Sequence, residues 1–472
     1  MLLKYFYDPA LSQASYLVGC QSCGEALIVD PARDITPYLE AARAENLQIR
    51  HIVETHIHAD YVSGARELAA HTGAQLYLSA MGGDEWQYAF ADANTRLLRD
   101  GDTFQFGAVR LSAIHTPGHT PEHLVFALTD TKMADQPMGL FTGDFLFAGD
   151  IGRPDLLETA AGIAGTKEIG ARQQFQNVQR FKQLPDYLQI WPGHGAGSAC
   201  GKALGSVPST TLGYEKLFNP AFQIENEDEF VEWLLSDQPE TPRYFGQMKR
   251  VNRAGPPLLR ELETPRPLEG FILNEAVKNG LLVIDARSAE EYRSAHVPGT
   301  INIPPTGKFS SYAGEFIDYS KPTYLIAASE NVDELVRQLR AIGVDNLPGY
   351  FPPRELGKAL EVLATMPPET VAKRADEVFL LDVRGATEYR EGHLPNAYHI
   401  PLGQVAERLD ELPRSRTIVA YCSSGVRSQI VASLLKSRGF AEVANMDGGF
   451  DAWKAAGLPV ETATEIGEKP TL

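Results

Sequence analysis

The stretch His56-Ile-His58-Ala-Asp60-Tyr-Val-Ser-Gly64 decides how the first half of the chain is interpreted. It follows the apolar run Ile52–Val53, which is typical of a strand end, and precedes Ala65–Ala70, which is typical of a helix. Alternate residues of such a loop can point the same way, so two imidazoles and a carboxylate can converge on one spot. These groups together suit a borderline metal ion such as zinc or iron. A polar loop with surface histidines is the alternative, and it is disfavoured because the three groups fall within five residues.

Composition limits the class of protein. The 472 residues are too many for one core, so several domains are expected, and 43% hydrophobic residues suit packed globular domains. A net charge of −18 argues against nucleic acid or an anionic membrane surface as the main partner. The four cysteines are too few for a disulfide scaffold, and the sequence shows neither a signal peptide nor a membrane span. A cytoplasmic enzyme is therefore expected.

Strands are predicted in two batches along the first part of the chain, which predicts two sheets covered by helices. The predicted strands are Ser15–Gly19, Ala26–Asp30, Ile49–Val53, Gln75–Leu78, Thr103–Phe106, Val109–Ile114, Leu124–Leu128, Gly139–Thr142 and Leu188–Trp191. The predicted helices are Thr36–Ala44 and Lys167–Phe181. His119, Asp144 and His194 follow on loops at strand ends, where catalytic groups are commonly placed.

The combined pattern resembles the metallo-β-lactamase superfamily over residues 1–252, on His56, His58, Asp60, His119, Asp144 and His194. The resemblance implies an αββα sandwich. The glyoxalase II branch has a further histidine where this chain has Tyr61, so a second metal would lose a nitrogen ligand and a dinuclear hydrolase is disfavoured. His56, His119 and Asp144 remain as two imidazoles and one carboxylate, a set that suits non-haem Fe(II) and O₂ chemistry.

Within the superfamily, the chain is more similar to the persulfide dioxygenases, also called sulfur dioxygenases. The similarity rests on the segments Thr55–Asp60, Pro117–Thr120, Thr142–Asp144 and Gly152–Asp155. It implies one Fe(II) per chain on His56, His119 and Asp144, with zinc as the alternative in isolated protein. His58, Asp60 and His194 are then orienting groups or ligands of a second metal. The implied reaction converts a low-molecular-weight thiol persulfide, such as glutathione persulfide, and O₂ into sulfite and thiol.

Three further residues are candidates for substrate contact: Arg153, Cys200 and Tyr61. The resemblance places Arg153 against a carboxylate of the thiol carrier, for which a guanidinium is a bidentate donor; an ion pair with Asp155 is the alternative. Cys200 follows His194 closely and is expected either to exchange sulfane sulfur with substrate or to be a buried inert thiol. His115 and His123 flank the His119 motif and are interpreted as structural.

Cys20 and Cys23 form a Cys-x-x-Cys between two predicted strands. No second cysteine pair and no adjacent histidine accompany them in the sequence. A structural zinc site or a redox motif is therefore disfavoured at this position.

Residues 253–366 and 367–472 repeat one pattern after a proline-rich linker. Leu281–Arg287 and Val378–Arg384 each form a buried strand that ends in Asp-x-Arg, and each is followed by a Glu-Tyr pair and a His-x-Pro segment. Strands and helices alternate in both copies, which predicts parallel α/β sheets. Both copies resemble the rhodanese (sulfurtransferase) family.

Only the second copy carries a thiol, at Cys422, followed by Ser423, Ser424, Gly425, Val426 and Arg427. This turn can aim backbone N–H groups at one point, and the following helix adds its positive end; both stabilise a thiolate or an anionic persulfide. Cys422 is thus predicted to be the nucleophile that carries sulfane sulfur, with Arg427 adding charge nearby. A cysteine phosphatase is disfavoured because its loop has more than the four residues that separate Cys422 from Arg427 here.

The first copy has Ala327-Ala328-Ser329-Glu330 at the corresponding loop, and no cysteine occurs between Cys200 and Cys422. It is therefore interpreted as a degenerate rhodanese-like domain. The sequence predicts an enzyme that couples persulfide oxidation to sulfur transfer between persulfide, sulfite and thiosulfate in sulfide detoxification. No nucleic acid or membrane partner is expected, and a homo-oligomer is compatible with the sequence. The main alternative is a dinuclear zinc thioester hydrolase, glyoxalase II-like, fused to a sulfurtransferase; a non-catalytic sulfur carrier is disfavoured by the complete ligand set.

Overall fold

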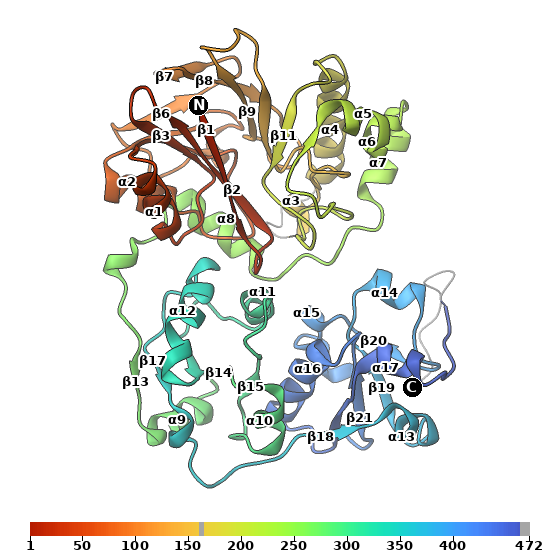
Figure 1. Cartoon of the computed structure of the whole chain (residues 1–472). Coiled ribbons are helices and arrows are strands. Elements are labelled where there is room, and N and C mark those ends of the chain that lie inside the picture. The colour runs from red at the N-terminus through yellow and green to blue at the C-terminus, as the bar shows by residue number, and fades with distance from the viewer. Residues whose placement is uncertain (160–164, 463–472) are drawn as a thin grey trace. The chain divides into compact units, whose positions relative to one another are not determined.

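The computed structural model describes residues 1–159 and 165–462 (Figure 1). The chain forms two compact units, Met1–Leu262 with Arg340–Gly343, and Glu263–Leu339 with Val344–Leu472. The domain boundary predicted after Asn252 falls inside helix α8 (Phe245–Ala254). Residues 463–472 of the third predicted domain lie outside the described residues. None of the helices in the described part of the chain is long and apolar enough to span a membrane.

The first unit is built on two six-stranded sheets, ordered β1-β2-β3-β4-β5-β6 and β12-β11-β10-β9-β8-β7. The strands of the first sheet are β1 (Leu2–Asp8), β2 (Gln13–Cys20), β3 (Glu25–Val29), β4 (Gln48–Val53), β5 (Gln75–Ser79) and β6 (Thr95–Leu98). Those of the second are β7 (Thr103–Phe106), β8 (Val109–His115), β9 (Leu124–Asp130), β10 (Gly139–Gly143), β11 (Gln189–Pro192) and β12 (Thr210–Thr211). The helices are α1 (Thr36–Ala44), α2 (Ala65–Thr72), α3 (Leu156–Thr159), α4 (Thr166–Lys182), α5 (Leu212–Phe218), α6 (Pro220–Gln223), α7 (Glu227–Leu235) and α8.

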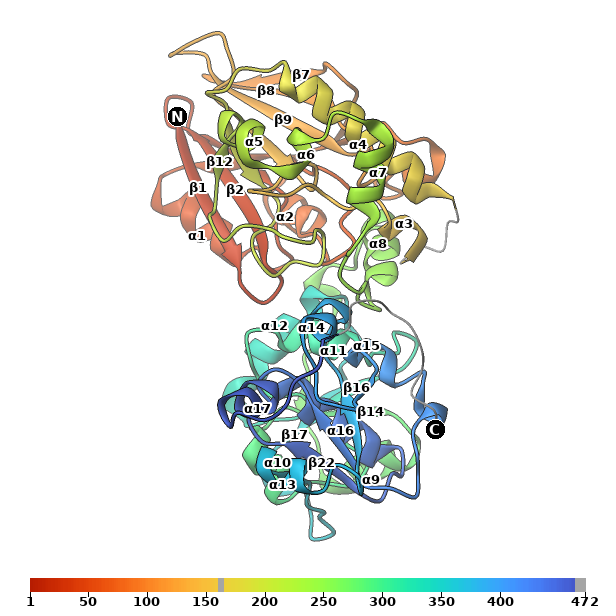
Figure 2. The same cartoon turned by 90° about the vertical axis from the view of Figure 1, so that its right-hand side faces the viewer.

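Three apolar layers hold these elements together. Side chains from both sheets, among them Tyr16 and Phe126, pack face to face in a central core. A second core joins the outer face of the first sheet to α1 and α2, and a third joins the other sheet to α4–α7, which cover it in Figure 2. Because each sheet buries one face against its partner and the other against helices, the predicted αββα sandwich is confirmed.

The second unit contains two five-stranded sheets with the same connectivity, ordered β13-β17-β16-β14-β15 and β18-β22-β21-β19-β20. The first consists of β13 (Arg266–Pro267), β14 (Leu282–Asp285), β15 (Ile301–Asn302), β16 (Thr323–Ile326) and β17 (Gly349–Phe351). The second consists of β18 (Ala364–Met366), β19 (Phe379–Asp382), β20 (Tyr398–His399), β21 (Ile418–Tyr421) and β22 (Val443–Met446). All neighbouring strands are parallel, as predicted.

The helices of the second unit follow the same duplicated order. They are α9 (Gly270–Lys278), α10 (Ala289–Ser294), α11 (Phe309–Gly314), α12 (Val332–Ala341), α13 (Pro368–Lys373), α14 (Ala386–Glu391), α15 (Leu402–Val405), α16 (Val426–Ser437) and α17 (Gly449–Ala455). In the first copy Arg287 donates to Asp285 and to the carbonyl of Ala295. In the second copy Arg384 donates to Asp382 and to the carbonyl of Gly392. The repeated Asp-x-Arg motif therefore ties a strand end to the turn after the next helix in both domains.

Candidate functional sites

The predicted metal-binding side chains gather where strands of the first unit end. His56 and Asp60 follow β4, His119 lies between β8 and β9, and Asp144 and His194 follow β10 and β11. All five side chains are buried. The loops that follow four strands far apart in the sequence thus meet at one place.

His56, His119 and Asp144 form one compact group. Asp144 Oδ2 lies 3.8 Å from His56 Nε2 and 3.5 Å from His119 Nε2. One ligand atom from each of the three residues lies within 4.8 Å of the others. The two-imidazole, one-carboxylate set expected from the sequence is therefore brought together.

Each histidine that faces Asp144 is fixed through its other ring nitrogen. Nδ1 of His56 lies 2.9 Å from Thr55 Oγ1, Nδ1 of His119 lies 2.9 Å from the carbonyl of Arg153, and Nδ1 of His194 lies 3.0 Å from the carbonyl of Ser12. A carbonyl only accepts, and the Thr55 hydroxyl already donates to Asp30, so each Nδ1 carries the proton. The lone pair of each Nε2 is consequently directed at the group around Asp144, as metal-binding histidines require.

A metal ion fits this donor set. His56 Nε2 and both carboxylate oxygens of Asp144 and Asp60 are buried without a hydrogen-bond partner among the described residues. Burying such atoms unpaired is costly, and a cation coordinated by them would offset that cost. Burial, followed by the charges of neighbouring histidines, lowers the pKa of His56 well below its usual range, so its ring is neutral and can act as a ligand.

A second group consists of Asp60, His194 and Cys200, whose ligand atoms also lie within 4.8 Å of one another. His194 Nε2 is 3.2 Å from Asp60 Oδ2 and 3.4 Å from Asp144 Oδ1, so it links the two groups. Burial, and then the charge of Asp144, raises the pKa of the Cys200 thiol well above its usual value. Cys200 thus lies beside Asp60 and His194, and its raised pKa disfavours the thiolate form.

His58 lies apart from both groups. Its Nε2 is 3.3 Å from Asp30 Oδ1 and 3.5 Å from Glu54 Oε2, and all three side chains are buried. Burial lowers the pKa of His58, but the charges of Asp30 and Glu54 outweigh burial and raise it to about 10. Asp30, Glu54 and His58 thus form a third buried group, whose ligand atoms lie within 4.8 Å of one another.

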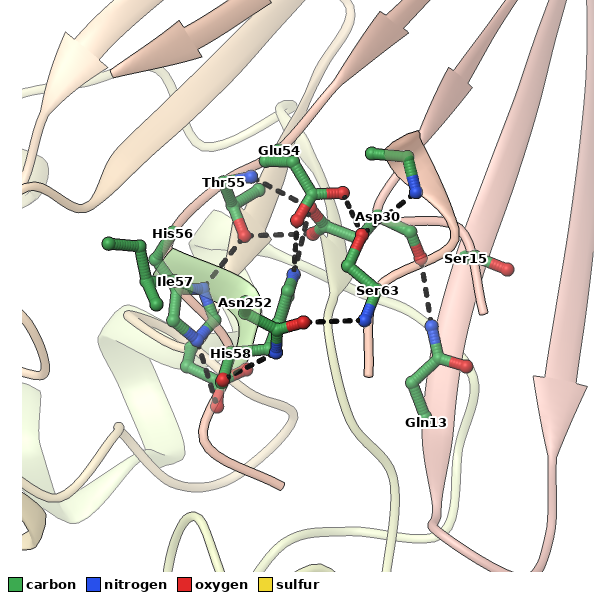
Figure 3. Close-up of polar contacts among 12 residues, drawn as sticks. Gln13, Ser15, Asp30, Glu54, Thr55, His56, Ile57, His58, Ser63 and Asn252 are labelled. Atoms are coloured by element: carbon green, nitrogen blue, oxygen red, sulfur yellow. Dashed lines mark hydrogen bonds and ion pairs between the residues drawn. The ribbon is translucent and has the colours of Figure 1, made fainter. Parts of the chain in front are cut away.

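Asp30 organises the loop that carries the first histidines (Figure 3). Its carboxylate accepts from the Thr55 amide at 2.7 Å and from the Thr55 hydroxyl at 2.8 Å, and its carbonyl accepts from Gln13 at 2.8 Å. Asp30 has φ 49°, in the left-handed region that costs energy for a residue with a side chain. The contacts with Thr55, which orient His56, stabilise this backbone conformation. No sequence motif assigned Asp30 a role.

Asn252 on α8 holds the other end of the same loop (Figure 3). Its side-chain oxygen accepts from the Ser63 amide at 2.9 Å, and its amide donates to the carbonyls of His58 and Tyr61 at 2.8 and 2.6 Å. Three backbone groups are thereby satisfied by one buried side chain. No motif marked this residue, because its role depends on a helix that packs back on the loop from 189 residues away.

Arg153 and Tyr61 do not present free groups to a substrate. The buried Arg153 guanidinium donates to both oxygens of Asp155, at 2.8 and 2.6 Å, and to the carbonyls of Ala199 and Pro239. The expected contact with a substrate carboxylate is not made by this geometry, and the alternative pairing with Asp155 is observed. The Tyr61 hydroxyl is buried and donates to the carbonyl of Asp30, so it too is a structural contact.

His123 and His115 have the structural roles expected for them. His123 Nε2 accepts from the amide of Asp144 at 3.1 Å, and its Nδ1 lies 2.8 Å from the Thr116 hydroxyl. His115 Nε2 lies 2.8 Å from the carbonyl of Pro121. His123 therefore fixes the backbone from which the Asp144 carboxylate extends.

In the second unit, Cys422 directly follows β21, and the loop Ser423-Ser424-Gly425 leads from it into α16. Its sulfur accepts from the amide of Gly425 at 3.1 Å and lies 3.5 Å from the Ser428 hydroxyl. Gly425 has φ 97°, which only glycine adopts easily, so the loop can turn its amide inward. The buried thiol therefore faces the N-terminal end of α16, as predicted from the loop sequence.

Glu388 on α14 is a member of this loop that the sequence analysis did not single out. It accepts from both terminal nitrogens of Arg427, at 2.6 and 2.7 Å, and from the Ser423 hydroxyl at 2.7 Å. Burial raises the pKa of Glu388, but the hydrogen bonds and charge of Arg427 outweigh it and lower the pKa to about 2. The charge that Arg427 brings to the loop is therefore largely balanced by Glu388.

In the degenerate copy, the corresponding segment forms a short 3₁₀ turn, Ser329–Asn331, between β16 and α12. No thiol is present, and Glu330 is exposed. This copy keeps the Asp-x-Arg motif but has no nucleophile.

Comparisons with known proteins agree with this division. A model of the metallo-beta-lactamase superfamily matches residues 8–196, and a model of the rhodanese-like domain matches residues 272–350 and 367–456. A probable polyketide biosynthesis zinc-dependent hydrolase of Bacillus velezensis is 28% identical over 226 residues, covering 48% of this chain and 88% of that protein. A mitochondrial persulfide dioxygenase of Homo sapiens is 32% identical over 234 residues, covering 49% of this chain and 79% of that protein.

One solved structure is similar over a longer part of the chain. The crystal structure of a metallo-beta-lactamase from Staphylococcus aureus is 44% identical, has a TM-score of 0.68, and covers 75% of this chain and 99% of that chain. The buried histidines and aspartates of the first unit, the duplicated sheets of the second unit and these matches point the same way. The chain belongs to the metallo-β-lactamase superfamily, and two rhodanese-like domains follow its metallo-β-lactamase domain.

Proposed function

We propose that the first unit is a non-haem iron persulfide dioxygenase that oxidises a low-molecular-weight thiol persulfide with O₂ to sulfite and thiol. The observation that carries this proposal is the group formed by His56, His119 and Asp144, in which two Nε2 lone pairs face one carboxylate. Two imidazoles and one carboxylate are the protein ligands typical of non-haem Fe(II) oxygenases, and an iron ion held by them would supply the chemistry for substrate and O₂. The similarity to a human persulfide dioxygenase supports the same assignment.

The residues around the group have separate roles in this proposal. His56, His119 and Asp144 hold the ion, while Thr55 and the carbonyl of Arg153 keep the two rings in the orientation that binding requires. When bound, Fe(II) supplies the electron-transfer chemistry that O₂ needs to react. The buried surroundings exclude bulk water from the reacting sulfur. The Cys200 thiol lies beside Asp60 and His194, where it can contact the terminal sulfur of a persulfide.

A dinuclear zinc hydrolase is the second candidate function. Asp60, His194 and Cys200 form a group with metal-ligand geometry next to the first, and Asp144 lies between them. A similar protein from Bacillus velezensis is named as a zinc-dependent hydrolase. Against this candidate, the Tyr61 hydroxyl donates to a backbone carbonyl, so it supplies no ligand in place of the missing histidine.

The second unit is proposed to transfer sulfane sulfur through Cys422. The Cys422 thiolate attacks the terminal sulfur of a thiol persulfide, the S–S bond breaks, and the thiol leaves as a thiolate. Sulfite then attacks the sulfur now bound to Cys422, and thiosulfate leaves while the Cys422 thiolate is restored. The Gly425 amide and the N-terminal end of α16 stabilise the anionic sulfur at each stage. The reverse direction, from thiosulfate to a thiol, uses the same contacts.

The test of the dioxygenase proposal is metal analysis of protein purified without oxygen, combined with O₂ uptake on glutathione persulfide. We expect one iron per chain, O₂ uptake that depends on the persulfide, and sulfite as product. Two zinc ions per chain, together with thioester hydrolysis and no O₂ uptake, would contradict it and favour the hydrolase. The Cys422→Ser variant should be assayed in parallel, so that sulfite is not consumed by the second unit.

Replacing Glu388 with glutamine is expected to change the choice of sulfur donor. Arg427 then loses its balancing charge, so dianionic thiosulfate should be used about fivefold better relative to glutathione persulfide, the effect of one charge at about 4 Å in water. The measurement is kcat/KM for both donors at low and high salt, because the gain should shrink as salt screens the charge.

The exposed Glu391 on the same helix provides a matched control. Glu391→Gln removes the same charge without contacting Arg427, and it should leave the donor ratio unchanged. An equal loss of activity toward both donors in Glu388→Gln would instead mean that Glu388 serves only to hold the loop in shape.

A further inference from the structure

The turn between β2 and β3 places two thiols together. Cys20 ends β2, and its carbonyl accepts from the amides of Cys23 at 3.3 Å and Gly24 at 2.9 Å. A turn closed in this way keeps the first and fourth Cα atoms within about 7 Å. A disulfide spans Cα atoms about 4.4–6.8 Å apart, so the backbone of this turn is compatible with one.

Both sulfur atoms lie next to Gly107, on the side where a side chain at that position would be. A Cβ atom added to Gly107 would lie 2.4 Å from Cys20 Sγ and 2.7 Å from Cys23 Sγ. Both sulfurs therefore point to one side of the turn, into room that any larger residue at position 107 would fill. The Cys23 thiol donates to the carbonyl of Cys20 at 3.6 Å, which holds its sulfur on the same side of the turn as the Cys20 sulfur.

Their surroundings make the two thiols chemically different. The Cys20 sulfur accepts from the Ala108 amide and lies beside the Ser22 hydroxyl, each at 3.3 Å. Burial raises the pKa of Cys20, but these hydrogen bonds and the neighbouring Cys23 outweigh it and lower the pKa to about 6. Burial, and then the neighbouring Cys20, raises the pKa of Cys23. Cys20 is buried, whereas Cys23 is exposed. A stabilised thiolate thus lies behind a thiol that solvent can reach.

A metal site does not explain the pair. Among the described residues, neither cysteine belongs to a group of three or more side chains that could hold an ion. A redox motif was disfavoured from the sequence because the pair lies between predicted strands, with no second cysteine pair and no adjacent histidine. In the structure a thiolate at Cys20 is stabilised by the Ala108 amide, which lies between β7 and β8 of the second sheet.

We propose that Cys20 and Cys23 form a redox-active dithiol that exchanges with low-molecular-weight disulfides such as oxidised glutathione. The exposed Cys23 thiol loses its proton and attacks one sulfur of glutathione disulfide, a mixed disulfide forms, and one glutathione thiolate leaves and takes up a proton. The Cys20 thiolate then attacks Cys23 Sγ, the Cys20–Cys23 disulfide forms, and the second glutathione leaves. Two cysteine thiols lose two electrons and two protons, and one disulfide becomes two thiols. A leaving thiolate as stable as Cys20 also makes the bond easy to reduce again.

The dithiol is separate from the candidate metal centre and from Cys422, and its test needs no activity assay. Trypsin releases residues 5–33 as one peptide that holds Cys20 and Cys23 but neither Cys200 nor Cys422. After incubation of the full chain with oxidised glutathione, alkylation and digestion, we expect this peptide to be lighter by two hydrogens and unalkylated. Dithiothreitol should restore two alkylated cysteines. Two alkylated cysteines after oxidation would overturn the proposal.

Single variants test the order of the steps. Cys20→Ser should accumulate the mixed disulfide between Cys23 and glutathione, because the thiol that resolves it is missing. Cys23→Ser should react at least about tenfold more slowly, because the remaining thiol is buried. Equal amounts of mixed disulfide in the wild type and in Cys20→Ser would overturn the proposal, because Cys20 would then not resolve it. The Ser22→Ala variant, which keeps both thiols, should still form the disulfide and serves as the folding control.

Discussion

Replacing Asp144 with alanine should abolish persulfide-dependent O₂ uptake and lower the iron content. Its carboxylate is the only one in the group with His56 and His119. Partners that merely orient a ligand typically cost 10–100-fold in affinity or activity when they are removed, so loss of a direct ligand should cost more than about 100-fold. The measurements are iron per chain and the initial rate of O₂ uptake with glutathione persulfide.

The fold should survive this change. In the metal-free protein the Asp144 carboxylate is held by the charges of His194 and His119: burial raises its pKa, but these charges outweigh burial and lower it. The thermal midpoint of the metal-free variant should therefore be below that of the metal-free wild type, while the unfolding transition stays cooperative. The exposed Asp135, changed to alanine, is the matched control and should keep iron and activity. Full O₂ uptake in Asp144→Ala would contradict the assignment of the centre.

Replacing Cys422 with serine should abolish sulfur transfer and leave O₂ uptake largely intact. The sulfane sulfur is carried on Cys422 Sγ, and a serine hydroxyl has neither the nucleophilicity nor the capacity to form a persulfide. Loss of a nucleophile should lower the transfer rate by at least about a thousandfold. The assay is formation of thiosulfate from glutathione persulfide and sulfite, with mass spectrometry of the Cys422 peptide.

Two observations would separate this result from a folding defect. Cys422 is in contact with the Gly425 amide and Ser428, and a serine can keep the amide contact, so the fold of the loop should persist. Ser424→Ala in the same loop keeps the nucleophile and should keep transfer. Transfer that persists in Cys422→Ser would mean that another thiol, with Cys200 the first to examine, carries the sulfur.

The fold could be predicted where the hydrophobic pattern is periodic. Helix α1 and strand β7 occur at the predicted residues, because their burial follows that pattern. Strand β1 was not predicted because its side chains are only partly buried and it pairs along a sheet edge. Strand β6 was missed for a similar reason, since only Leu98 in it is buried. Edge strands take their stability from pairing, which composition does not encode.

The grouping of His56, His119 and Asp144 was expected from the resemblance of their motifs to one family, and the structure brings the three together. The place of Cys422 before a helix followed from its loop sequence. The groups that orient these residues were not predicted, because Asp30, Asn252 and Glu388 act across contacts that form only in the folded chain. For Arg153, sequence alone could not separate a substrate ligand from a structural ion pair. The deciding fact is that its donors are already occupied by Asp155 and backbone carbonyls.

The carbonyls of Ser12 and Arg153, which accept from His194 and His119, come from the main chain. Each oxygen belongs to the backbone, so a substitution at either position acts on the imidazole only through a shift of the main chain. His56 lacks this protection, because its partner is the hydroxyl of Thr55. The three histidines of the candidate metal centre thus differ in their sensitivity to substitution. A change at Thr55 removes the partner of His56 directly and should alter the orientation of its ring.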